Sequence, residues 1–123
     1  MALSVLYIFT RNALSSESKE GFEVLMASVA MELQVSVLLI NDGIYLLKAE
    51  QGDRSADDVL AQTGASHKRF FALPDFDIAP VHVCERSLKG RGLVSDDLGL
   101  PIEPCDRDEI AHLIRASDRV LVF

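Results

Sequence analysis

One short run constrains the fold of this chain more than any other feature. Val35-Ser36-Val37-Leu38-Leu39-Ile40 is rich in β-branched residues and almost continuously apolar. Such a run is typical of a strand that is buried on both faces, which requires helices on both sides of its sheet. The preceding segment has helical spacing instead, because its apolar residues recur every three or four positions. These residues are Phe22, Leu25, Met26, Val29 and Leu33.

The alternation of strand and helix patterns continues along the chain. Residues 3–9 are predicted to form the first strand, and Ser18 is predicted to cap the first helix. Pro80 opens a strand at 81–84, which leads into a short basic helix. Asp106 is the predicted cap of a helix at 107–116, and residues 120–123 form the last strand. The inward residues of that helix are expected to be Ile110, Leu113 and Ile114.

Three segments are less regular. Residues 41–43, Asn-Asp-Gly, have turn chemistry, and residues 56–62 have a helical pattern. Residues 101–104 fit either a short strand or an extended link.

Strands that alternate with helices imply right-handed crossovers and parallel pairing. The chain has 123 residues, of which 49% are hydrophobic, enough for one core without disulfides or metal. We therefore expect a single domain over residues 1–123 with an α/β fold. Its architecture would be a three-layer α/β/α arrangement around a largely parallel sheet of about five strands. Chemistry in such sheets collects at the carboxyl ends of strands, here 10–12, 41–43 and 84–86.

Composition argues against several classes of function. The two cysteines do not form a C-x-x-C pair and the three histidines lack zinc-ligand spacing, so no metal site is predicted. The segment 10–18 contains no glycine, which argues against a nucleotide cofactor. A net charge of −7 disfavours direct binding of nucleic acid. No signal peptide or bilayer-spanning run is recognised, so we expect a soluble, cytoplasmic protein without membrane contact.

Cys84 is the candidate catalytic residue. It lies where the strand at 81–84 gives way to a helix, and Arg86 adds a nearby cation. A helix N-terminus and a cation both favour thiolate, the nucleophilic form of cysteine. A small buried hydrophobe that happens to be cysteine is an equally good interpretation. His82 shares a face with Cys84 but is expected to be a core residue, and Cys105 is expected to have no role.

Two segments are candidates for contact with other subunits. Ile44-Tyr45-Leu46-Leu47 follows the turn at the mouth of the sheet, where a polar loop is usual. These residues either form a contact surface, with Tyr45, Leu46 and Leu47 as interface residues, or cap the domain's own core. Phe70 and Phe71 pose the same choice, and we expect them to lie in the core. Phe123 is the other interface candidate, because no helix follows its strand and another subunit would cover it.

Several motifs together resemble the DsrE/DsrF family, and the resemblance runs nearly end to end. They are Glu20-Gly21-Phe22, residues 41–47, Val83-Cys84 with Ser87-Leu88, Arg91-Gly92-Leu93, and residues 118–123. Within the family the chain is most similar to the TusC (DsrF-like) subunits. The loop at 13–18 departs from the pattern, since it lacks the proline and glycine that the family often has there.

The resemblance implies a sulfur relay. Members of the TusB, TusC and TusD group form a heterohexamer that accepts persulfide sulfur and passes it through a downstream carrier protein towards 2-thiolation of the wobble uridine in tRNA. The family's sulfur-carrying cysteine belongs chiefly to the TusD/DsrE-like subunit, at a position that Cys84 matches. TusC-like chains are usually structural partners, which makes this chain's status as an enzyme uncertain.

Three hypotheses follow. The preferred one is a non-catalytic subunit that packs against TusB-like and TusD-like partners. The second is a sulfurtransferase that carries a persulfide on Cys84, or a DsrF-like subunit in dissimilatory sulfur oxidation. The third is a small-molecule-binding module unrelated to sulfur.

Overall fold

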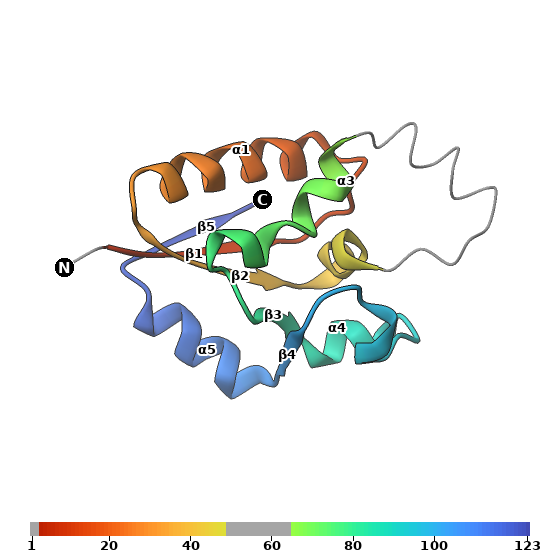
Figure 1. Cartoon of the computed structure of the whole chain (residues 1–123). Helices are drawn as coiled ribbons and strands as arrows, with labels where there is room; N and C mark the ends of the chain where they lie inside the picture. Colours follow the sequence, from red (N-terminus) through yellow and green to blue (C-terminus); the bar gives the residue numbers. More distant parts are fainter. Residues whose placement is uncertain (1–2, 49–64) are drawn as a thin grey trace.

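A computed structural model describes residues 3–48 and 65–123 of the chain. Within these ranges five strands form one sheet in the order β4-β3-β2-β1-β5, and every pair of neighbours is parallel (Figure 1). The strands are β1 (Ser4–Phe9), β2 (Gln34–Leu39), β3 (Val81–Cys84), β4 (Ile102–Cys105) and β5 (Arg119–Val122). The predicted parallel α/β fold is confirmed, and the ambiguous segment at 101–104 contributes a strand.

Helices cover both faces of this sheet. Figure 1 shows α1 (Ser16–Ala30) and α3 (Ala65–Phe70) above the strands and α5 (Arg107–Ala116) below them. The first face carries the larger apolar cluster, to which β1 contributes Val5, Tyr7 and Phe9. The second face carries a smaller cluster of Leu6, Ile8 and Leu38. This division follows from the side-chain alternation of a strand that has helices on both sides.

Short helical segments lie between several of these elements. The 3-10 helix η1 (Asn41–Leu47) follows β2, and η2 (Leu73–Phe76) precedes β3. Helix α4 (Glu85–Gly90) follows β3 directly, and η3 (Ser95–Asp97) leads to β4. The predicted turn at 41–43 is therefore the first part of a longer 3-10 helix. The predicted helix at 56–62 lies outside the described residues.

Two capping predictions have different outcomes. Asp106 caps α5 as predicted: its carboxylate accepts a hydrogen bond from the Glu109 backbone at 2.8 Å. The predicted cap Ser18 is wrong, because Ser15 occupies that position and accepts from the Glu17 backbone at 3.1 Å. Ser18 is instead buried inside the first turn, where its hydroxyl donates to the carbonyl of Asn12 at 2.8 Å. Several serines near one helix start leave the cap undecided until the incoming loop is placed.

The inward face of α5 is also narrower than predicted. Ile110 and Leu113 pack against the smaller apolar cluster, as expected. Ile114 is 41% exposed, so its predicted inward position is wrong. Among the described residues no helix combines the length and the apolar character needed to cross a membrane.

Candidate functional site

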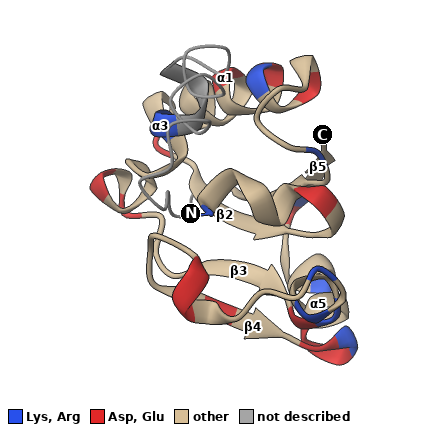
Figure 2. Cartoon of the chain, turned by 90° about the vertical axis from the view of Figure 1, so that its right-hand side faces the viewer, with Lys and Arg blue, Asp and Glu red and all other residues tan. Residues whose placement is uncertain are grey.

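The topology brings the three predicted strand-end segments to one edge of the sheet. Because β3, β2 and β1 are parallel neighbours, the residues that follow them emerge on the same side. Figure 2 looks onto the right-hand side of Figure 1, where η1 and α4 lie. Lys and Arg are interspersed with Asp and Glu in this view.

Polar contacts join η1 to α4 at this edge. The hydroxyl of Ser87 accepts a hydrogen bond from the backbone of Asn41 at 2.9 Å. The guanidinium of Arg91 pairs with the carboxylate of Asp42, with Nη2 and Oδ1 2.9 Å apart. These contacts fix the helix that follows Cys84 against the segment that follows β2.

Close packing at Gly43 turns η1 back onto the sheet. A Cβ at this position would lie 2.0 Å from the carbonyl oxygen of Phe9. Only glycine allows the backbone to approach so closely. As a result, Ile44, Leu46 and Leu47 are fully buried.

This burial corrects the predicted interface. Leu46 and Leu47 belong to the chain's own core and have no surface to offer a partner, so the alternative interpretation of this segment applies to them. Tyr45 differs, because it is half-buried and keeps part of its side chain at the surface. A 3-10 helix in this place turns its apolar side inward, whereas the sequence alone left a contact surface and the domain's own core as alternatives.

Phe123 is also largely engaged inside the chain. Its ring stacks near the rings of Phe9 and Tyr7, with centroids 5.9 and 6.2 Å away. Its carbonyl oxygen accepts hydrogen bonds from the backbone and the hydroxyl of Thr10. The exposed apolar residues of this strand are its neighbours Leu121 and Val122, at 37% and 62% exposure. The sequence prediction missed them, because the side on which each residue of β5 falls depends on its pairing with β1.

Cys84 lies where the sequence placed it. It is the last residue of β3 and the residue before the first turn of α4, it is half-buried, and its thiol is free. The predicted neighbour Arg86 is exposed. Lys89 pairs with Glu85 at 2.8 Å on the same helix. The residue is therefore only partly covered at the carboxyl edge of the sheet.

Cys105 is the residue whose surroundings the sequence did not reveal. It is the last residue of β4 and pairs in register with Cys84. Its Sγ atom lies 3.7 Å from Nδ1 of His82, so His82 faces Cys105. Burial raises the pKa of the Cys105 thiol to about 11, helped by the negative charges of Glu109 and Glu103. The sequence did not reveal this cluster, because residues 101–104 fitted either a short strand or an extended link.

A shallow pocket adjoins this cluster. Its lining comes from β3, β4 and α5 and consists mainly of titratable residues: His82, Glu103, Cys105, Asp106, Asp108, Glu109, His112 and Leu113. His82 Nδ1 is also 3.8 Å from the carboxylate of Glu103. In the described part of the chain, no group of three or more His, Cys, Asp or Glu residues is arranged to hold a metal ion.

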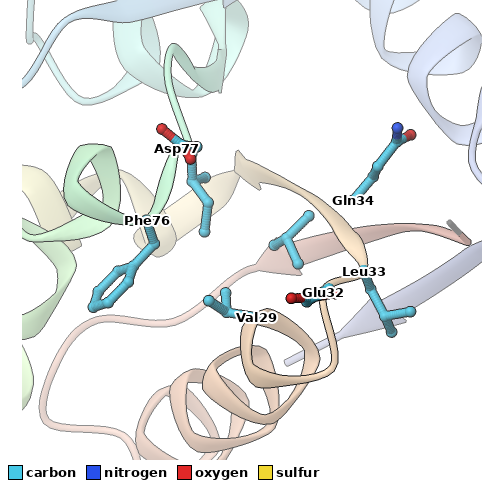
Figure 3. Close-up of a pocket in the computed structure, with 8 residues that line it drawn as sticks. Val29, Glu32, Leu33, Gln34, Phe76 and Asp77 are labelled. Atoms are coloured by element: carbon cyan, nitrogen blue, oxygen red, sulfur yellow. The ribbon is translucent and has the colours of Figure 1, made fainter.

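A second pocket lies elsewhere on the molecule. Figure 3 shows it between Val29 and Glu32 on one side and Phe76 and Asp77 on the other, next to Gln34 at the start of β2. Because Gln34 begins the strand, this pocket is at the amino ends of the parallel strands. It is therefore separate from the edge that carries Cys84 and Cys105.

The sequence of this chain is similar to those of several known proteins. The model of the DsrE/DsrF-like family matches residues 3–123. A Vibrio vulnificus protein named "Protein TusC homolog" is 35% identical over 108 residues, which cover 88% of this chain and 87% of that protein. A Pseudomonas aeruginosa protein of the same name is 29% identical over 124 residues and covers both chains fully. "Protein TusC" of Buchnera aphidicola is 31% identical over 109 residues, covering 88% and 87%.

Solved structures share the fold. The crystal structure of the ychN protein from E. coli superposes with a TM-score of 0.76 over 100% of both chains, at 20% sequence identity. At this identity the likeness concerns the fold alone.

Proposed function

We propose a function from one premise: the chain belongs to the DsrE/DsrF-like family. On this basis it is a TusC-type subunit of a sulfur-relay complex, and it assembles with TusB-like and TusD-like subunits in a heterohexamer in the cytoplasm. The complex passes persulfide sulfur to a downstream carrier protein and on towards 2-thiolation of wobble uridine in tRNA. The observation that carries the proposal is the alignment with TusC homologues over 88% or more of the chain.

In this proposal the chain acts mainly through its surface. Among the described residues, β5 pairs on one side only, with β1, and its Val122 is 62% exposed. An edge strand with large exposed apolar side chains is a common site of subunit contact. We therefore place the principal contact on Leu121 and Val122, and we keep the half-buried Tyr45 and Phe123 as the remaining predicted interface residues.

Co-purification tests this proposal. The tagged chain is co-expressed with TusB-like and TusD-like chains, and the complex is measured by size-exclusion chromatography with light scattering. Val122→Lys should reduce recovery of the partners, because a lysine on an edge strand opposes association. Val94→Lys is the matched control, since Val94 is also 62% exposed but lies outside the sheet. A lone monomer in the presence of both partners would refute the proposal.

A second candidate function rests on the free, half-buried thiol of Cys84 at the strand edge. As a sulfurtransferase, the chain would itself accept sulfane sulfur as a persulfide on Cys84. In the reconstituted complex, Cys84→Ser would then stop sulfur transfer without preventing assembly. If this variant transfers sulfur at the wild-type rate, the sulfurtransferase role is refuted and only the structural role remains. A DsrF-like role in sulfur oxidation would be distinguished by which partner proteins co-purify.

A further inference from the structure

Two thiols that are far apart in the sequence lie side by side at the carboxyl edge of the sheet. Cys84 ends β3, Cys105 ends β4, and the two residues are partners in the parallel register. Neighbouring strands are about 4.8 Å apart. Disulfides join residues whose Cα atoms are roughly 4.4–6.8 Å apart, so the register brings this pair within bonding range.

Both side chains also leave the sheet on the same face. Partner residues of a parallel pair share a face, and His82 shares the face of Cys84 because it is two positions earlier on β3. The 3.7 Å contact between Cys105 Sγ and His82 Nδ1 places the Cys105 thiol on that face as well. Each cysteine is the last residue of its strand.

The two thiols have different surroundings. Cys84 is half-buried, whereas Cys105 is only 2% exposed. Cys105 must lose a proton before it can act as a nucleophile, and its raised pKa opposes that loss. His82 Nδ1 is placed to accept the proton, because it lies 3.7 Å from Cys105 Sγ, and the carboxylate of Glu103 lies 3.8 Å from the same nitrogen.

We propose that Cys84 and Cys105 form a dithiol that discharges a persulfide from the chain as hydrosulfide. The Cys84 thiolate first attacks the outer sulfur of a donor persulfide R–S–SH, which yields Cys84–S–SH and releases the thiolate R–S⁻. The Cys105 thiolate then attacks the Cys84 sulfur of that persulfide. The bond between the two persulfide sulfurs breaks, the Cys84–Cys105 disulfide forms, and HS⁻ leaves.

The electrons of this sequence balance without an external oxidant or reductant. The sulfane sulfur is reduced to sulfide, and the two cysteine thiolates are oxidised to a disulfide. A dithiol reductant would restore the starting state by thiol–disulfide exchange. The proposal rests on the second candidate function, because Cys84 must first accept a persulfide. It implies that sulfur loaded on Cys84 does not stay there.

Intact mass spectrometry of the full chain tests the proposal. The reduced protein is treated anaerobically with glutathione persulfide, and hydrosulfide is measured in parallel. The wild-type chain should lose two hydrogen atoms and release stoichiometric hydrosulfide. Cys105→Ser should instead retain one added sulfur atom on Cys84, and Cys84→Ser should show neither change. Cys105→Ala is a second variant in case a buried serine hydroxyl disturbs folding.

A wild-type chain that keeps the added sulfur as long as Cys105→Ser does would overturn the proposal. So would wild-type protein that gains no sulfur and forms no disulfide. The chain alone is sufficient for this measurement, so its outcome is independent of whether the chain co-purifies with other subunits. A failed discharge and a failed assembly are therefore distinguishable results.

The role of His82 as proton acceptor is tested by measuring the rate of hydrosulfide release as a function of pH. His82→Gln should slow hydrosulfide release at neutral pH, and the rate should recover as pH rises towards the thiol pKa, because a deprotonated Cys105 no longer needs a base. A purely structural role would lower the rate at every pH. The other titratable groups that line the pocket beside Cys105 are Glu103, Asp106, Asp108, Glu109 and His112. They are unchanged in this variant.

Discussion

Gly43 provides a sharp test of how the edge of the sheet is built. Replacing a helical glycine by alanine normally stabilises a protein by about 0.4–1 kcal/mol when the backbone conformation suits both residues. Here the added methyl carbon would lie 2.0 Å from the carbonyl oxygen of Phe9 and 2.7 Å from its carbonyl carbon. Ordinary contact begins near 3.4 Å, and the obstructing atoms belong to the backbone of β1. The sign of the effect should therefore reverse.

The expected cost of Gly43→Ala is set by overpacking. To relieve the contact, η1 must move away from β1, which disturbs the fully buried Ile44, Leu46 and Leu47. Inserting a methyl group into packed surroundings costs about 1–3 kcal/mol. Because the strand backbone cannot yield as a flexible side chain does, we expect the upper end, about 3 kcal/mol.

Urea unfolding followed by far-ultraviolet circular dichroism measures this difference, since the chain has no tryptophan. Protein concentration is held constant, because association would add to the apparent stability. The matched control is Gly90→Ala in α4, where a Cβ would meet nothing within 4 Å. It should gain about 0.4–1 kcal/mol. If Gly43→Ala proves as stable as the wild type, the close approach of η1 to β1 is wrong.

Three further outcomes are expected. Asp118→Ala should lower stability, because the Asp118 carboxylate accepts hydrogen bonds from the backbone and hydroxyl of Ser4 at 2.8 and 3.2 Å. These bonds lower the pKa of Asp118. Their stabilisation is therefore present above the unfolded-state pKa and disappears as pH falls through the folded-state pKa. The urea midpoints of the variant and the wild type should converge in acid. Asp42→Ala removes the ion pair with Arg91 and should lower the free energy of unfolding by about 0.2–1 kcal/mol. Added salt should reduce this loss of stability, and a loss that does not change with salt would contradict the prediction. Burial raises the pKa of Cys105 to about 11, so its alkylation, followed by peptide mass spectrometry, should be slow at neutral pH and accelerate in alkali; rapid neutral labelling would disprove it.

The sequence by itself determined most of the local elements. The apolar run at 35–40 overlaps β2, and Pro80 marks the start of β3 as predicted. Asp106 caps α5, as its position before the helical pattern indicated. These features are short-range, because a cap, a proline or a side-chain period acts through neighbouring residues. The alternation of such elements was enough to indicate the α/β fold.

The tertiary structure alone decided which side chains face the core and which face one another. Leu46 and Leu47 are apolar in either interpretation, and only the approach of η1 to β1 at Gly43 puts them inside. The pairing of Cys84 with Cys105 likewise depends on β4 lying beside β3, although 20 residues separate the two cysteines. Strand order and register arise from long-range contacts, whose partners a local pattern does not identify.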